Sequence, residues 1–563
     1  MKTLVREIFT TSPLRIWGTL VFFLLSFSNP FPVLLFERPT INLNPIQREN
    51  QLVGTTDWQL SNPAAEDNNT FTYPAIQGYA WTTSAQVGDE VQFSVSTTSP
   101  SFSADVYRMG WYEGKGGRLM QSIATIQGHA YPLPSPNAST GLIEANWPVA
   151  FTLKTNPGWA SGMYMVKLTA SNGEQSYIPC VLRSSKPRTF AFIHAANTDE
   201  AYNFWGGTSL YRNLTHTFQG NRAFKVSFDR PFEQDRGAGL FFWFEYPMVR
   251  WLEQHGYDVG YLSDPDLQIN PYPLLDYDAL LIVGHSEYWS KQMRDALEGA
   301  VNKGVNLAVF GANSLYWQIR YESRSSGGQA IPDRIIVCYK SQALDPLYGK
   351  ENDLVTVKSR ASPLNKPEQS LLGSMWAGQF TPRKGGFPWV VADASSWVFA
   401  GTGLRDGASL PGLVGYEYDQ VNPNYPIPKG VEILAASPVT DDINNKPDMA
   451  NATLYTATSG ARVFNAGTFE WSWGLDSNSS IERFWSPGNT SRHPSLVNKA
   501  AQKITANILQ NFVHTGNPSQ EGALNLQRVI PYAFVTLLLL SLGYCYWVWR
   551  KVGASAKGKA EGS

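Results

Sequence analysis

Alternation of hydrophobic and polar residues marks the first long stretch of regular pattern in the chain. In VGDEVQFSVS, Val91, Phe93 and Val95 recur at every second position after a Gly-Asp turn, and ADVYRMGWY and SGMYMVKLTA repeat the pattern. A period of two is typical of strands with one buried face, and the Gly, Pro and Asn turns between them indicate an antiparallel, Ig-like β-sandwich. We expect this domain over residues 76–185, after a stalk over residues 37–75.

A different pattern follows the sandwich. TFAFIHA, DALLIVG and VNLAVFGAN are continuous apolar runs, which are typical of strands buried on both faces. Helical periodicity separates them, because Phe244, Met248 and Leu252 recur at i, i+4 and i+8, and a second apolar stripe ends at Gly304. Strands that alternate with helices predict a doubly wound parallel sheet, of a glutamine-amidotransferase-like α/β kind, over residues 186–516.

Two uncharged apolar segments are long enough to cross a membrane. Residues 530–549 follow a linker at 517–529 and precede a basic tail at 550–563. Residues 16–36 follow the basic residues 1–15; a cleaved signal peptide is the alternative, but no small-x-small cleavage site follows. The distribution of Lys and Arg predicts cytoplasmic termini, a main part outside the cytoplasm, and the lipid bilayer as a partner.

Length and charge narrow the class of protein. A chain of 563 residues predicts two or more domains. With 45 Lys+Arg against 46 Asp+Glu and no basic stripe, nucleic acid is excluded as a partner. Charged residues make up only 16% and aromatic residues 13%, so we expect a surface rich in Trp and Tyr. Apart from one strand at VEILAAS, residues 340–441 are a loop-rich insertion to which the pattern assigns no fold.

Polar residues stand at the ends of four predicted strands. Tyr202 lies shortly after TFAFIHA, His285 and Glu287 follow DALLIV, Asn313 follows VNLAVFG, and Glu470 follows ARVFNAG. Each residue alone is more often a capping or surface group, but the carboxyl ends of parallel strands meet at one edge, where ligands bind. The polar residues at the four strand ends together predict a ligand-binding site at this edge of the sheet. The sequence has no G-x-S-x-G, H-E-x-x-H, G-x-x-x-x-G-K or C-x-x-C motif.

Four motifs carry a family resemblance. DEAYNFWGGTSLY, GHSEYWS, GANSLYW and GTFEWSWGL occur in this order after the predicted sandwich, and they resemble the large subunit of N,N-dimethylformamidase over roughly residues 76–516. The resemblance implies hydrolysis of a small amide C–N bond at a mononuclear iron held by two tyrosines and one carboxylate. By motif these ligands are Tyr202, Glu287 and Tyr164, although the pattern alone makes Tyr164 a core residue of a sandwich strand.

The implied cofactor is one Fe3+ per chain, because three anionic oxygen ligands suit ferric iron better than zinc. Glu470 would move the proton from water to the leaving amine, while His285 and Asn313 would bind the tetrahedral intermediate. A small amide substrate, a homo-oligomer and a small partner subunit are the partners that the resemblance suggests. The membrane segments and the insertion are differences from that enzyme, so we do not expect this chain to act on the same substrate.

Two other functions stay open from the sequence. With 19 tryptophans, an exported sandwich and an inactive enzyme domain could form a surface binding module for glycans or cell-wall polymers. The two membrane segments and the insertion are also compatible with a structural partner in a membrane complex.

Overall fold

The computed structural model describes most of the chain between the two predicted membrane segments. The described residues are 42–215, 220–269, 274–324, 330–380, 386–443, 445–477 and 496–513. The predicted membrane segments, residues 16–36 and 530–549, lie outside them. Within the described residues, no helix is both long enough and apolar enough to cross a membrane.

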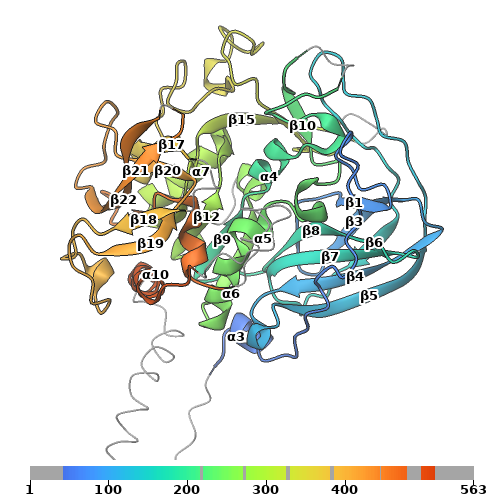
Figure 1. Cartoon of the computed structure of the whole chain (residues 1–563), viewed down its shortest axis with the longest axis horizontal. Coiled ribbons are helices and arrows are strands. Elements are labelled where there is room, and N and C mark those ends of the chain that lie inside the picture. Colours follow the sequence, from blue (N-terminus) through green and yellow to red (C-terminus); the bar gives the residue numbers. More distant parts are fainter. Residues whose placement is uncertain are drawn as a thin grey trace, which may run out of the picture. The chain divides into compact units, whose positions relative to one another are not determined.

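Two sheets form the predicted sandwich (Figure 1). The five-stranded sheet has the order β2 (Ser84–Gln86), β8 (Gln175–Arg183), β7 (Gly162–Ala170), β4 (Ser101–Met109), β5 (Gly117–Gln127). The three-stranded sheet has the order β1 (Ile76–Ala80), β3 (Glu90–Thr97), β6 (Phe151–Lys154). All neighbouring strands are antiparallel except β2 and β8. The inward positions Val91, Phe93 and Val95 lie in the core, as their period of two predicted.

The second domain is built on a seven-stranded sheet. Its order is β11 (Val259–Ser263), β9 (Phe190–His194), β12 (Ala279–His285), β14 (Asn306–Ala312), β23 (Arg462–Asn465), β22 (Lys446–Thr456), β21 (Glu432–Asp441). The first five strands are parallel, and β22 and β21 add an antiparallel edge. The chain runs from β9 out to β11 and then back to β12 on the other side of β9. The strand order therefore reverses between β9 and β12, which makes this the switch point of the sheet.

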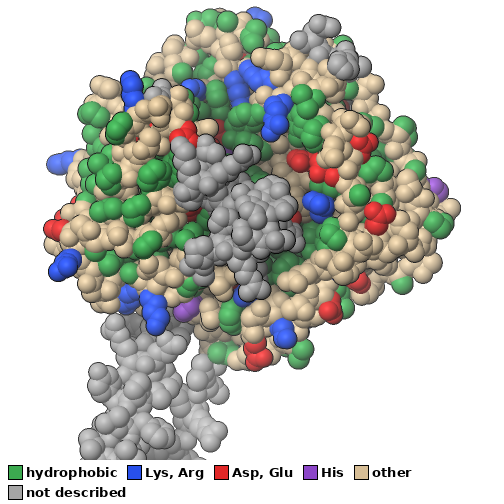
Figure 2. Space-filling model, viewed as in Figure 1, with side chains coloured by type: hydrophobic (Ala, Val, Ile, Leu, Met, Phe, Trp, Pro, Cys, Tyr) green, Lys and Arg blue, Asp and Glu red, His purple; other side chains and the backbone are tan. Residues whose placement is uncertain are grey.

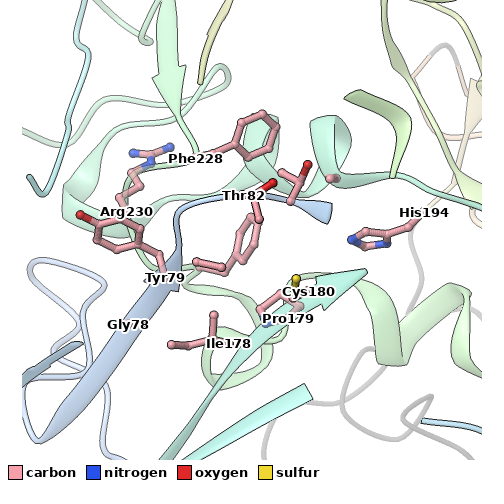
Figure 3. Close-up of a pocket in the computed structure, with 13 residues that line it drawn as sticks. Gly78, Tyr79, Thr82, Ile178, Pro179, Cys180, His194, Phe228 and Arg230 are labelled. Atoms are coloured by element: carbon pink, nitrogen blue, oxygen red, sulfur yellow. The ribbon is translucent and has the colours of Figure 1, made fainter. Parts of the chain in front are cut away.

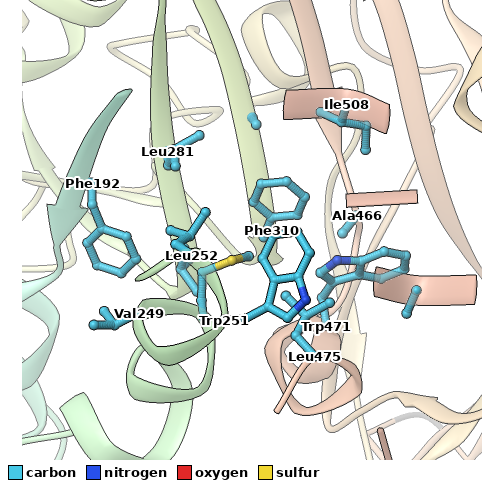
Figure 4. Packing of buried hydrophobic residues seen from close by; sticks show 14 of the residues in the cluster. Phe192, Val249, Trp251, Leu252, Leu281, Phe310, Ala466, Trp471, Leu475 and Ile508 are labelled. Atoms are coloured by element: carbon cyan, nitrogen blue, oxygen red, sulfur yellow. The ribbon is translucent and has the colours of Figure 1, made fainter. Parts of the chain in front are cut away.

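Both faces of this sheet are covered, as continuous apolar strands require. Phe190 and Phe192 of β9 face a cluster with helices α6 (Tyr246–Gln254) and α10 (Lys499–Phe512), part of which is seen in Figure 4. The alternate residues Ala191 and Ile193 face a cluster with α7 (Lys291–Asn302). Ser290 caps α7 by accepting a hydrogen bond from the N–H of Met293 at 3.1 Å.

Shorter elements complete the described part of the chain. The remaining helices are α3 (Pro45–Glu49), α4 (Ala196–Tyr202), α5 (Phe241–Phe244) and α8 (Gln369–Leu372). The 3-10 turns include η2 (Trp205–Gly207), η4 (Asp264–Gln268) and η9 (Phe469–Gly474). A four-stranded sheet has the order β10 (Lys225–Ser227), β16 (Ile335–Val337), β15 (Trp317–Glu322), β13 (Tyr288–Ser290). The insertion folds into two strand pairs: β17 (Met375–Gln379) with β20 (Glu417–Gln420), and β18 (Phe387–Val390) with β19 (Ser409–Val414).

The segment before the sandwich differs from the predicted stalk, because the part that the structure describes is packed. Ile46 of α3 and Trp58 are buried in the cluster that also contains α6. The Trp58 ring stacks on Phe242 with 5.3 Å between ring centroids. A composition rich in Asn, Pro and Thr therefore does not describe an extended spacer here, because a few large apolar side chains suffice to anchor the segment.

A buried ion pair joins the sandwich to the α/β domain. Arg108 on β4 and Glu253 on α6 are 2.7 Å apart, and both side chains are fully buried. Glu253 also accepts hydrogen bonds from Tyr261 of β11 and from Asn50. Charges taken out of water are costly unless each has partners, so this network restricts how the two domains can dock.

Removing one member of the pair should destabilise the protein strongly. We expect Arg108→Met to lower the free energy of unfolding by about 3–5 kcal/mol, because Glu253 would remain buried as an unpaired charge. The double variant Arg108→Met/Glu253→Met should lose less. Urea unfolding of the three proteins measures both values, and a double variant less stable than Arg108→Met would contradict the argument.

Candidate functional site

The loops after β9 and β12 are bound to each other at the switch point. Gly284 lies just before the end of β12 with a φ of +67°, and a Cβ there would lie 2.3 Å from Cβ of Phe244. Only glycine suits this turn, which ends the apolar run and presents the residues after it. The N–H of Glu287 donates to the hydroxyl of Thr198 on α4 at 2.9 Å. The motif GHSEYW is therefore attached directly to the helix that carries Tyr202.

Two phenol oxygens meet at the carboxylate of Glu287, and a third lies beside one of them. The hydroxyl groups of Tyr202 and Tyr211 donate to the same oxygen, Oε2, at 2.9 Å and 2.8 Å. The two phenol rings are stacked with 4.3 Å between centroids. The hydroxyl of Tyr288 lies 2.6 Å from that of Tyr211. The structure thus brings together the predicted Tyr202 and Glu287, and adds Tyr211 and Tyr288, which the predicted ligand set did not include.

Tyr211 could have been found from the sequence, because it ends the same motif, DEAYNFWGGTSLY, that contains Tyr202. Between them the chain makes the turn η2, where Gly206 and Gly207 have φ of +80° and +88°. This turn returns the chain toward α4. Tyr211 is 37% exposed, yet its hydroxyl points inward to Glu287, so the group lies at the rim of the site.

Tyr164 does not join this group. It lies on β7 in the sandwich core, 1% exposed. Its hydroxyl donates to the carbonyl of Ala160 at 2.7 Å, and its ring stacks on Trp159. The structure therefore corrects the expectation that this residue stands beside Tyr202 and Glu287. Tyr164 is an inward-facing core residue of a sandwich strand, as the alternating pattern alone predicted.

Charge at the site depends on burial and on two nearby basic groups. Burial by itself would raise the pKa of Glu287, but His285 and Lys340 outweigh it and hold that pKa below its usual value. Nε2 of His285 lies 3.3 Å from Oε2 of Glu287 without the geometry of a hydrogen bond. Burial and then the charge of Glu287 raise the pKa values of Tyr202 and Tyr211 well above 10. Glu287 is thus an anion whose two phenol neighbours stay protonated unless a cation replaces the protons.

A second carboxylate reaches the site from the insertion. The side-chain amide of Asn313, just after β14, donates to Glu417 of β20 at 2.7 Å. The backbone N–H of Asn313 donates to Asp419 of the same strand at 2.8 Å. Burial and then the charge of Glu287 raise the pKa of Glu417 well above its usual value. Asn313 therefore holds Glu417, and no sequence pattern had singled out this glutamate.

Glu470 is the most buried of the predicted site residues. It lies in η9, fully buried, and both carboxyl oxygens lack a hydrogen-bond partner in the described part of the chain. A Cβ on Gly415 would lie 1.9 Å from its carboxyl carbon. Burial raises the pKa of Glu470, and burial followed by the charges of Glu417, Glu287 and Glu470 raises that of Tyr416. Tyr416 thus stands among all three glutamates.

The donor set decides which metal could bind. Among the described residues, no cluster of three or more His, Cys, Asp or Glu side chains could hold a metal ion. A metal at this site would depend on phenol oxygens as well as on Glu287. Tyrosinate and carboxylate are hard oxygen donors, and two tyrosinates with one carboxylate carry three negative charges, which fits a trivalent ion such as Fe3+. The residues present therefore fit the implied iron.

With this geometry established, comparison with known proteins gives the family. The family model "N,N-dimethylformamidase beta subunit-like, C-terminal" matches residues 103–483, more than half of the chain. The chain belongs to this family, as its motifs predicted. The matched region includes Tyr202, Tyr211, Glu287, Glu417 and Glu470.

Other comparisons add little. No curated relative matches the sequence. A solved structure of Paenibacillus sp. cycloisomaltooligosaccharide glucanotransferase, complexed with cycloisomaltoheptaose, is similar over 47% of this chain and 33% of its own, with 11% identity and a TM-score of 0.14. The chain thus spans about a third of the length of that protein, and a likeness this low supports no conclusion.

A separate cavity lies where the sandwich meets the end of β9. It has a volume of about 30 Å³ and is lined by residues of both domains, including Tyr79, Cys180 and His194 (Figure 3). Nδ1 of His194 is 2.8 Å from Oε2 of Glu245. Burial would lower the pKa of His194, but the charge and hydrogen bond of Glu245 outweigh it and raise the pKa to about 9. A His–Glu pair thus lies at the wall of this cavity, with His194 among the lining residues.

The pair predicts a loss of stability at alkaline pH. The pKa of His194 is about 9 in the folded chain, against about 6.5 for an ordinary histidine, so its contribution is complete below pH 6.5 and is lost as pH rises through 9. We expect the unfolding free energy of the natural protein to fall by about 3 kcal/mol more than that of His194→Gln between pH 6 and pH 10. Denaturant unfolding at both pH values measures this, and an equal fall in the two proteins would contradict it.

Proposed function

We propose that the chain is a hydrolase that cleaves the C–N bond of a small amide, with iron held by Tyr202, Tyr211 and Glu287. One observation carries the proposal: two phenol oxygens lie within 2.9 Å of a single carboxylate oxygen of Glu287. Membership in the dimethylformamidase beta subunit-like family supports the reaction class. The proposal replaces Tyr164 by Tyr211 in the ligand set that the resemblance had implied.

The electrostatics of the site support a strongly charged cation. Burial and Glu287 hold the pKa values of both phenols well above 10, so only such an ion would keep them deprotonated near neutral pH. When bound, iron would supply a Lewis acid that polarises a carbonyl oxygen and lowers the pKa of water. The protein's part is to hold the three oxygen donors together and to keep them out of bulk solvent.

Glu417 is the best candidate for proton transfer. Its pKa is raised by burial and by the charge of Glu287, whereas the pKa of Glu287 itself is lowered. Carboxyl groups whose environments push their pKa values apart divide acid and anion roles between them. In the proposed reaction Glu417 gives its proton to the amide nitrogen as the C–N bond breaks, and recovers one from the attacking water. Asn313, which donates to Glu417 at 2.7 Å, positions it.

The competing function, a glycan-binding module, loses its main support in the structure. That idea rested on exposed tryptophan platforms, but every tryptophan among the described residues is buried or half-buried. The large exposed hydrophobic side chains in this part of the chain include Leu, Val, Ile and Tyr, and no Trp. The amide hydrolase is therefore the better supported proposal. It keeps two sequence-based expectations, a main part outside the cytoplasm and anchoring in the bilayer at both ends.

The ligand set can be tested with two matched substitutions. We expect the natural protein to bind about one iron per chain with a visible tyrosinate-to-iron absorption band. Tyr211→Phe should weaken the band, because only Tyr202 would remain as a tyrosinate ligand, and should weaken iron binding by at least about tenfold. Tyr164→Phe removes a buried hydroxyl in the sandwich and should keep both the band and the iron. Metal analysis and absorption spectra of the three proteins measure this; loss of iron only in Tyr164→Phe would restore Tyr164 as the ligand.

The role of Glu417 is tested by kinetics on a panel of small amides. Glu417→Gln keeps the shape of the side chain and its contact with Asn313 but removes the transferable proton. We expect kcat/KM to fall by about 10²- to 10⁴-fold, with iron content retained. Glu470→Gln serves as the comparison. A fall of this size in the kcat/KM of Glu470→Gln, but not in that of Glu417→Gln, would assign proton transfer to Glu470.

A further inference from the structure

Three cationic side chains lie along two aromatic residues beside the proposed iron site. Nζ of Lys340 is 4.9 Å and Nζ of Lys358 5.8 Å from the ring centroid of Trp317. Lys358 and Arg360 lie 5.2 Å and 5.1 Å from the ring centroid of the preceding residue, Tyr316. Figure 2 shows Lys and Arg side chains gathered beside a green hollow over β15, the strand that begins at Trp317. We call these three cations the basic row.

The basic row begins at the iron site itself. Nζ of Lys340 is 3.4 Å from the ring centroid of Tyr211 and 5.2 Å from that of Tyr288. The N–H of Trp317 donates to the carbonyl of Glu287 at 3.0 Å, and Tyr288 and Trp317 are paired in register between β13 and β15. A molecule with one end at Glu287 and the other along Trp317 and Tyr316 would therefore meet the row.

The two lysines of the basic row have no paired carboxylate among the described residues. Among the described residues, neither ammonium group has a carboxylate within ion-pair distance or a hydrogen-bond partner, whereas Arg360 is paired with Glu368 through Nε at 3.0 Å. Nη2 of Arg360 is buried without a hydrogen-bond partner in this part of the chain. Lys358 is exposed and its ammonium group can be hydrated, but a buried guanidinium N–H without an acceptor is costly. The unused donor of Arg360, with two unpaired lysines beside it, points to an anion from outside the chain.

The chemistry of the unused donors indicates what this anion is. Two ammonium groups and one guanidinium N–H are donors only, and none can accept a hydrogen bond. The adjoining aromatic faces favour a ligand that is short and flat rather than a hydrated ion. Hydrogen bonds between such donors and a carboxylate are about twice as strong as those between neutral groups.

We propose that Lys340, Lys358 and Arg360 form a subsite for a carboxylate on the substrate, so that the preferred substrate is a small amide that also carries a carboxylate group. This inference rests on the proposed amide hydrolase and names its substrate class. It departs from an uncharged amide such as dimethylformamide. The competing explanation is that the row only balances the negative charge of Tyr202, Tyr211 and Glu287, in which case it would not discriminate between ligands.

A binding experiment separates the subsite from catalysis. Levulinate has a carboxylate and a methyl ketone in place of an amide, so it cannot be hydrolysed, and its methyl ester is the neutral counterpart. Titration calorimetry on the iron-loaded full-length protein should show levulinate binding at least about tenfold more tightly than the ester. Lys358→Met should remove this preference, because it removes one of the cations that would bind the carboxylate. The iron site should stay intact, since Lys358 contacts none of the proposed iron ligands. Lys358→Arg should retain most of it.

The control is Lys154→Met, which removes the same charge from an exposed position on β6 and should leave the preference unchanged. Circular dichroism shows whether each variant is folded, and Lys358→Arg remains informative if Lys358→Met is not. Equal binding of levulinate and its ester by the natural protein, or an unchanged preference in Lys358→Met, would overturn the subsite. If the protein hydrolyses neutral amides but binds levulinate and its ester equally, the proposed function is supported and the subsite is not. If it prefers levulinate but hydrolyses no amide, the subsite is supported and the proposed function is not.

Discussion

The direct pairing of β9 with β12 is the constraint on which the site depends. Because the chain leaves β9 toward β11 and returns to β12 on the opposite side, the loops after these two strands lie where ligands bind in parallel sheets. The hydrogen bond from Glu287 N–H to the Thr198 hydroxyl holds these loops together. Tyr202, at the end of α4, donates from its hydroxyl to Glu287.

Desolvation gives the carboxyl groups of the site different charges. Glu287 stays ionised because His285 and Lys340 outweigh its burial, whereas Glu417, held by Asn313 and facing Glu287, has its pKa raised. The charge of Glu287 is one cause of the raised pKa of Glu417, because like charges in a buried site repel each other. The proposed division of work between metal ligand and proton donor follows from this asymmetry.

Packing between domains supports the site from a distance. The Arg108–Glu253 pair fixes α6 against the sandwich, and α6 lies on the face of the sheet that also carries Phe190 and Phe192 of β9. Tyr164 belongs to this supporting part of the protein. Its inward position on β7, two residues from the core residue Val166, is what a period of two dictates, whatever its distance in sequence from Tyr202.

Local patterns by themselves determined both domain types, the helices α6 and α7, and the polar residues at the ends of β9, β12, β14 and β23, because periodicity and capping are properties of neighbouring residues. Only the tertiary structure decided which polar groups meet. Tyr211 reaches Glu287 through the turn at Gly206 and Gly207, and Glu417 comes from an insertion in which no period was visible. Such convergence depends on long-range packing and on burial, which set both the position and the charge of each group, and neither is written in the spacing of residues along the chain.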